Sequence, residues 1–89
     1  MRRKIKFAES FPKKAKKLLK KNPHLEDVFR EVLRKLSADI FIPALHTHAL
    51  SGDLKGKYAC SLTYDLRIIF KFSDDAVHLL DIGSHDEVY

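Results

Sequence analysis

The stretch Tyr58-Ala-Cys-Ser-Leu-Thr-Tyr-Asp-Leu-Arg-Ile-Ile-Phe-Lys-Phe72 has the most regular pattern in the sequence. Apolar and polar residues alternate along both of its halves with a period of two, which is typical of β-strands with one buried face. The stretch therefore predicts two strands, at residues 58–64 and 66–72. Ser73-Asp-Asp75 predicts a turn into a third strand at 76–82. Three consecutive strands with short turns form an antiparallel meander.

A turn around Tyr64 decides which side chains of the first two meander strands lie opposite one another. Positions whose numbers sum to about 128 then form pairs, so we expect Ser61 to face Arg67. Both side chains project from the face opposite the apolar core. Cys60 falls on the core face, which predicts a buried and unreactive thiol.

Upstream of the meander, the apolar period becomes that of an α-helix. Apolar side chains recur three to four residues apart over 11–21 and again over 25–36, which predicts two amphipathic helices. Asn22-Pro23 predicts the break between them, because a residue before proline avoids the helical conformation. Such a pair reads as a helical hairpin.

A short alternating segment at 3–8 predicts a strand before the helices, whereas 39–57 show little regular pattern and 84–89 read as a short tail. The order strand, helix, helix, strand, strand, strand predicts one α+β domain over residues 1–89. In this fold the helical hairpin packs on a curved antiparallel sheet.

The charge of the 89 residues is distributed unevenly. The net charge is +5, but residues 1–21 alone carry ten Lys and Arg and one acid, and the rest is net negative. This asymmetry favours a polyanionic or strongly acidic partner, although a merely solvated helix face gives the same pattern. The lysines of the first helix are Lys13, Lys14, Lys16, Lys17, Lys20 and Lys21.

Composition excludes several classes of protein. A single cysteine excludes an intramolecular disulfide and the multi-cysteine metal modules. No apolar run is long enough to span a membrane. The first ten residues lack the apolar segment of a signal peptide, so we expect a cytoplasmic protein without membrane contact.

Histidines are the first candidates for acid–base chemistry, because their ordinary pKa lies near neutral pH. His85 follows the third meander strand in a polar segment, and His46 and His48 lie in the irregular connection. These residues and the single cysteine do not complete a metal coordination set, so we expect neither a metal nor another cofactor. His24 and His78 are expected to be structural.

Three motifs carry a resemblance to a known family. They are His48-Ala-Leu-Ser-Gly-Asp-Leu-Lys-Gly56, Tyr64-Asp-Leu-Arg-Ile-Ile-Phe70 and Leu80-Asp-Ile-Gly-Ser-His-Asp-Glu-Val-Tyr89. With the chain length, the basic first helix and the element order, the sequence resembles the YafQ-like branch of the RelE/ParE toxin superfamily. The resemblance implies the toxin of a type II toxin–antitoxin system.

The resemblance also implies an activity. YafQ-like and RelE-like toxins are ribosome-dependent endoribonucleases that cut mRNA in the ribosomal A site. The ribose 2′-OH attacks the adjacent phosphate and leaves a 2′,3′-cyclic phosphate and a 5′-OH, without a metal. This reaction needs a base, an acid and cations around the phosphorane.

Roles for individual residues follow from the same resemblance. His85 is expected to be the general acid, with Asp65 or His48 as the base. Arg67 would stabilise the phosphate, and Tyr89 would stack on or orient a nucleobase. Lys55 is a second candidate cation. Two further sets of RNA-binding candidates come from the residues themselves: Lys71, on the same predicted sheet face as Arg67, and Lys13, Lys16, Lys17 and Lys20 of the basic first helix.

The sequence departs from the family pattern at three positions, which leaves fewer side chains for acid–base catalysis. Ser61 stands where active members commonly have a histidine, Leu66 where an aromatic is frequent, and Asp81 where a basic residue is common. Two alternatives therefore stay open. One is a ParE-like inhibitor of DNA gyrase, and the other is a weakly active homologue that serves as an antitoxin-binding or operator-binding module.

The expected partners are a cognate antitoxin, the ribosome and mRNA. The antitoxin is expected to supply an acidic, amphipathic segment that folds on the basic surface. Operator DNA is expected to be bound only through the complex with the antitoxin.

Overall fold

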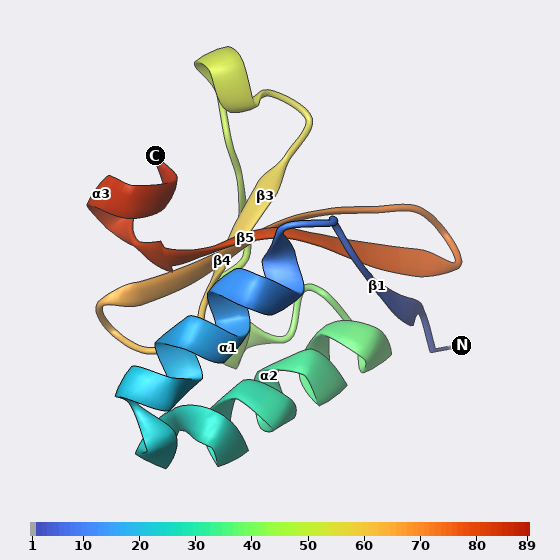
Figure 1. The fold of residues 1–89 in the computed structure, drawn as a ribbon. Helices are drawn as coiled ribbons and strands as arrows, with labels where there is room; N and C mark the ends of the chain where they lie inside the picture. The colour runs from blue at the N-terminus through green and yellow to red at the C-terminus, as the bar shows by residue number, and fades with distance from the viewer. Residues whose placement is uncertain (1) are drawn as a thin grey trace.

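A five-stranded sheet forms the centre of the computed structural model, which describes residues 2–89. Its strands are β1 (Lys4–Phe7), β2 (His48–Ala49), β3 (Tyr58–Ser61), β4 (Leu66–Phe72) and β5 (Ala76–Ser84). They lie in the order β1-β5-β4-β3-β2. β1 runs parallel to β5, and the other neighbouring strands are antiparallel (Figure 1).

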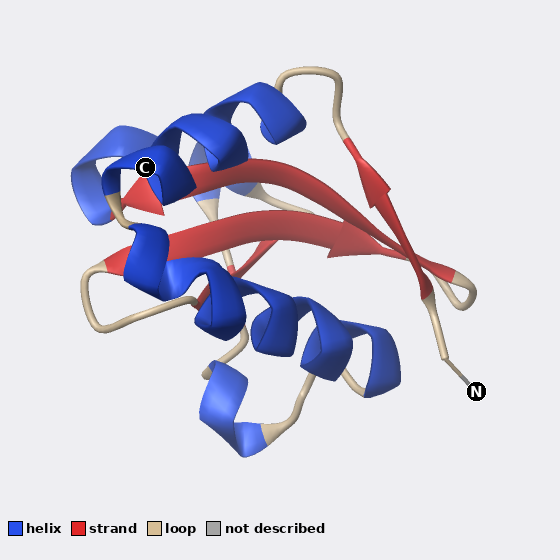
Figure 2. Cartoon of the chain, turned by 60° about the horizontal axis from the view of Figure 1, so that its bottom comes forward, coloured by secondary structure: helices blue, strands red, loops and turns tan. Residues whose placement is uncertain are grey.

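Two helices, α1 (Phe11–Lys21) and α2 (Glu26–Ala38), form the predicted hairpin and cover one face of this sheet (Figures 1 and 2). A 3-10 turn at Pro23–Leu25 joins them. Two further 3-10 turns, Pro43–Leu45 and Gly52–Leu54, lie in the connection from α2 to β3. A third α-helix, α3 (His85–Val88), is short and follows β5 directly.

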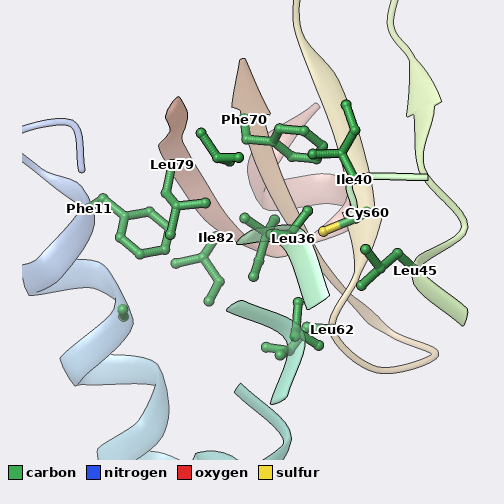
Figure 3. Close-up of a cluster of buried hydrophobic side chains, with 13 residues drawn as sticks. Phe11, Leu36, Ile40, Leu45, Cys60, Leu62, Phe70, Leu79 and Ile82 are labelled. Atoms are coloured by element: carbon green, nitrogen blue, oxygen red, sulfur yellow. The ribbon is translucent and has the colours of Figure 1, made fainter. Parts of the chain in front are cut away.

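The main core lies between the hairpin and the sheet. Phe11 of α1 and Leu36 of α2 are fully buried against Phe70 and Leu79 of the central strands (Figure 3). Burial of apolar side chains from both layers is the main source of stability in such a fold. Cys60 lies in this core, and burial raises the pKa of its thiol to about 12, as expected for an unreactive cysteine.

A second, smaller cluster lies on the opposite face of the sheet. Successive residues of a strand point to opposite faces, so Ala59 and Ile69 point away from the core that holds Cys60 and Phe70. Val88 of α3 packs against Ala59 and Ile69. α3 therefore covers only part of the face that the helical hairpin leaves open.

The strand register confirms the pairing predicted from the sequence. Ser61 lies opposite Arg67, and Arg67 lies opposite Gly83 on its other side. The register between β4 and β5 shifts between Ile69 and Phe70.

Three local expectations were wrong. The first meander strand ends at Ser61 instead of residue 64, because residues 62–65 form a bend closed by hydrogen bonds to Leu66. His48–Ala49, in the segment without pattern, pairs with β3 as an edge strand. The expected tail at 84–89 instead continues β5 to Ser84 and then forms α3.

Among residues 2–89, no helix combines the length and the apolar character that crossing a membrane requires.

Replacing Leu36 by Ala should lower the free energy of unfolding by about 2–5 kcal/mol, because it leaves a cavity at a fully buried position of α2. Val28→Ala on the same helix is the matched control. Val28 is partly exposed, so its loss should cost far less. Urea unfolding measures both values, and equal losses would contradict the described core.

Candidate active site

Arg67 is anchored by the bend that precedes its strand. Its Nη1 donates to the carbonyl oxygens of Thr63 at 2.9 Å, Tyr64 at 2.9 Å and Leu66 at 3.2 Å. No other polar partner of this guanidinium occurs among residues 2–89, so Nε and Nη2 are available. These two nitrogens form the planar fork with which arginine binds a phosphate or carboxylate in bidentate fashion. The structure therefore presents a pre-oriented cation for an anionic group.

His48 lies on the same face of the sheet as Arg67. It is opposite Ala59 in the β2–β3 pair, and directly opposed residues share a face. Its Nδ1 lies 3.1 Å from the carbonyl oxygen of His46. A carbonyl oxygen only accepts hydrogen bonds, so this contact holds the proton of a neutral ring on Nδ1. The unprotonated Nε2 then points away from the backbone and is available as a base.

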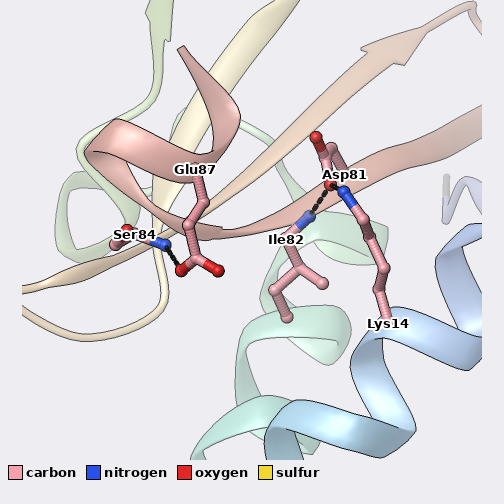
Figure 4. A network of polar contacts seen from close by, with 5 residues as sticks. All are labelled: Lys14, Asp81, Ile82, Ser84 and Glu87. Carbon is pink, nitrogen blue, oxygen red and sulfur yellow. Dashed lines mark hydrogen bonds and ion pairs between the residues drawn. The ribbon is translucent and has the colours of Figure 1, made fainter.

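A capping box fixes the start of α3. The Ser84 backbone N–H donates to Glu87 Oε1 at 2.9 Å (Figure 4). The backbone N–H and the hydroxyl of Ser84 both hold the pKa of Glu87 below its ordinary value. Gly83 permits this close approach, because a Cβ added there would lie 3.1 Å from Glu87 Cβ.

Tyr89 contacts both candidate histidines, His48 and His85. Its hydroxyl lies 3.5 Å from His48 Nε2. Its ring meets the His85 ring edge to face, with centroids 4.4 Å apart. Burial raises the pKa of the Tyr89 phenol above its ordinary value, although the charge of Arg67 opposes this shift. The hydroxyl is therefore a neutral donor at physiological pH.

His85 itself is well exposed at the first position of α3. Its Nδ1 lies 3.6 Å from a carboxylate oxygen of Asp86, an ion pair when the ring is protonated. Histidine is the side chain most often used for general acid–base catalysis, and the exposure of His85 leaves its ring accessible to a substrate.

An open groove of about 840 Å³ runs beside His48 and Arg67. Ser61, Thr63 and Tyr64 line it on the sheet side. α2 forms the other wall with Asp27 and Glu31 among its residues. A cation and a histidine thus line a groove that is open along the edge of the sheet.

Other predicted site residues form no hydrogen bond or ion pair with this group within residues 2–89. Asp65 is exposed in the bend, one residue beyond the last β4–β5 pair, and no side-chain hydrogen bond or ion pair of it occurs among residues 2–89. Lys55 is exposed after the Gly52–Leu54 turn. Lys71 is exposed on β4 opposite His78, four residues and roughly 13 Å along the strand from Arg67.

The α1 lysines divide between two sides of the helix. Lys14, Lys17 and Lys21 line a groove with Glu87 of α3. Lys16 and Lys20 line a separate groove on the other side of α1. Lys13 is exposed. Of the predicted RNA-binding lysines on α1, only Lys17 therefore lies in the groove beside α3.

Asp81 is tied to α1 instead of standing free. It forms an ion pair with Lys14 at 2.6 Å and accepts from the Ile82 N–H at 2.9 Å (Figure 4). The sequence departure at Asp81 thus removes a positive charge and engages one of the helix lysines. Leu66, another departure, packs against the main core.

Several contributors were missed from the sequence. His46 supplies the carbonyl that orients His48, and Val88 attaches α3 to the sheet. The spacing Ser84-x-x-Glu87 is that of a capping box and could have predicted α3. No local pattern in the sequence indicates the contact between His48 and Tyr89. Among the described residues, no group of three or more His, Cys, Asp or Glu could hold a metal ion.

Comparisons with known proteins agree with this architecture. The model of a family described as bacterial toxin of type II toxin-antitoxin system, YafQ, matches residues 3–89. A copper-bound mutant toxin from Helicobacter pylori is 32% identical and superposes with a TM-score of 0.82, with 100% of both chains covered. A search of curated proteins found no significant match.

Two further solved structures share the fold at lower identity. The E. coli DinJ–YafQ toxin–antitoxin complex contains a chain 22% identical, with a TM-score of 0.81, that covers 100% of this chain and 99% of its own. A YoeB/ParE toxin from Agrobacterium tumefaciens is 14% identical, with a TM-score of 0.78, over 92% of this chain and 98% of its own.

The helical hairpin on a five-stranded sheet defines an α+β toxin fold of the RelE/ParE kind. The chain belongs to the YafQ family of bacterial toxins of type II toxin–antitoxin systems. The resemblance drawn from the three sequence motifs is thereby confirmed.

The capping box predicts a pH-dependent α3. Because the pKa of Glu87 is lowered in the folded state, its stabilising contribution is present above the unfolded pKa and is lost as the pH falls through the folded pKa. In a carboxyl NMR titration, Ser84→Ala should move the pKa of Glu87 up toward its ordinary value. Ser10→Ala is the control, since the Ser10 side chain makes no capping bond. An unchanged pKa of Glu87 in Ser84→Ala would show that the Ser84 hydroxyl does not bind this carboxylate, and would contradict the capping box.

Proposed function

We propose that this toxin is a ribosome-dependent endoribonuclease that cleaves mRNA by attack of a ribose 2′-OH on the adjacent phosphate. One observation carries the proposal: His48 and Arg67 line one open groove at the edge of the sheet, and Tyr89 contacts both His48 and His85. Membership of the YafQ family supports the same activity.

The proposed base is His48. Its Nε2 is the unprotonated nitrogen of the neutral ring, and it accepts the proton of the 2′-OH once the substrate replaces the Tyr89 hydroxyl. Asp65, the other candidate, has no side-chain hydrogen bond or ion pair within residues 2–89 that would orient it. The observed contacts therefore favour His48.

The proposed acid is His85, which donates a proton to the departing 5′-oxygen. Its ring is exposed and held edge to face against Tyr89, so it can reach a strand bound beside that ring. The Nε and Nη2 fork of Arg67 stabilises the negative charge of the phosphorane. The bond that forms joins the 2′-oxygen to phosphorus, and the bond that breaks joins phosphorus to the 5′-oxygen.

The lysines of α1 provide the proposed contact with RNA outside the reacting phosphate. Lys17 and Lys21 lie beside α3 and extend the positive charge toward the site, whereas Lys16 and Lys20 are placed to hold a more distant stretch of ribosomal RNA. Binding through several phosphates releases counterions and weakens steeply with salt. The proposed role of α1 is thus attachment.

A cognate antitoxin is the proposed protein partner. The structure of the E. coli DinJ–YafQ complex supports this assignment by analogy. The net charge of +5, concentrated near the first helix, is suited to an acidic, amphipathic segment.

His85→Gln tests the proposal most simply at the level of one residue. Removing a general acid should lower the rate of mRNA cleavage by about 100-fold or more. Primer extension on ribosome-bound mRNA measures this loss. His24→Gln is the matched control, because His24 is exposed in the Pro23–Leu25 turn between α1 and α2 and is not one of the proposed catalytic residues. Thermal unfolding should be similar for both variants, and undiminished cleavage by a folded His85→Gln variant would refute the assigned role.

A further inference from the structure

Tyr64 is the most exposed large hydrophobic side chain among the described residues, with 92% of its surface accessible. It lies in the bend between β3 and β4, between Thr63 and Asp65. Neither apolar cluster includes it, so the core does not account for an aromatic ring there. The ring makes no aromatic pair within residues 2–89.

The bend that carries Tyr64 is firmly held. The backbone N–H groups of Leu62 and Thr63 donate to the Leu66 carbonyl at 2.9 and 3.3 Å, and the Leu66 N–H donates to Thr63 Oγ1 at 3.2 Å. Arg67 Nη1 binds the Tyr64 carbonyl itself at 2.9 Å. Because the backbone of this bend is already fixed, binding a ligand orders only the side-chain torsions of the ring.

The position of Tyr64 relates it to the candidate active site. It lines the same open groove as His48 and Arg67, and the guanidinium that would hold the phosphate also fixes its backbone. A nucleic-acid strand with one phosphate on the Nε and Nη2 fork of Arg67 would therefore pass the Tyr64 ring along this groove.

We propose that Tyr64 is a stacking platform for a nucleobase adjacent to the cleaved phosphate of single-stranded RNA. The inference deepens the proposed ribonuclease function and rests on it for the identity of the strand. Proteins that bind single strands stack bases on aromatic side chains, and this contact tolerates any base because each has a π-face. Tyr64 thus adds a binding subsite that is separate from the acid, the base and the phosphate-binding cation.

The test is an NMR titration of the full chain carrying His85→Gln with a short single-stranded RNA. The affinity is followed through backbone amide signals, which every variant retains, and the ring signals of Tyr64 report the contact itself where the ring is present. Tyr64→Ala in this background should weaken binding about 5- to 140-fold, the range that corresponds to the loss of a single aromatic–base stack. Tyr64→Phe keeps the ring and should bind within about threefold of the parent. Phe7→Ala is the matched control, since Phe7 is also exposed but lies on β1.

An abasic scan of the RNA identifies the stacked base. Removing one base next to the phosphate held by Arg67 should weaken binding to the parent and leave binding to Tyr64→Ala unchanged. Three results would each overturn the inference. The first is equal RNA affinity of Tyr64→Ala and the parent, and the second is an equal loss of RNA affinity in Tyr64→Phe and Tyr64→Ala. The third is that the ring signals of Tyr64 do not shift when RNA is added to the parent. This titration measures binding and not cleavage. Failure of the ribonuclease proposal would be seen in the primer-extension experiment, in which ribosome-bound mRNA would remain intact.

Discussion

Val88 packs on Ala59 of β3 and Ile69 of β4, and the geometry of the candidate active site depends on this contact. α3 has only four residues, and a helix that short is not stable in water by itself. The capping box closes its start, and burial of Val88 attaches it to the sheet. Because His85 opens α3 and Tyr89 follows it, the same contact sets where both rings lie.

The two faces of the sheet differ in how much of their surface the helices cover. α1 and α2 bury one face completely enough to supply the main core, which includes Phe11, Leu36 and Phe70. α3 covers only a small cluster on the other face, so His48 and Arg67 remain accessible beside it. Stability is therefore concentrated on one side of the sheet, which leaves the side chains of His48 and Arg67 accessible.

Much of the fold was predictable because its signals are local. The period of two from Tyr58 to Phe72 predicted the meander, and a turn near Tyr64 predicted the pairing of Ser61 with Arg67. The contact between His48 and Tyr89 was not predictable, since the residues are 41 positions apart and the chain around His48 has no periodic pattern. The role of α3 was also missed, because four residues are too few to show helical periodicity.

The central claim is that this face of the sheet cleaves RNA by transesterification, and the chemistry of the cleaved ends tests it most directly. Ribosome-bound mRNA is incubated with the toxin, and the cleaved nucleotide is mapped and then replaced by its 2′-deoxy form. The account predicts a 2′,3′-cyclic phosphate and a 5′-hydroxyl on the normal mRNA, and no cleavage at the deoxy position. Cleavage that persists at the deoxy nucleotide, or products with a 5′-phosphate, would contradict it.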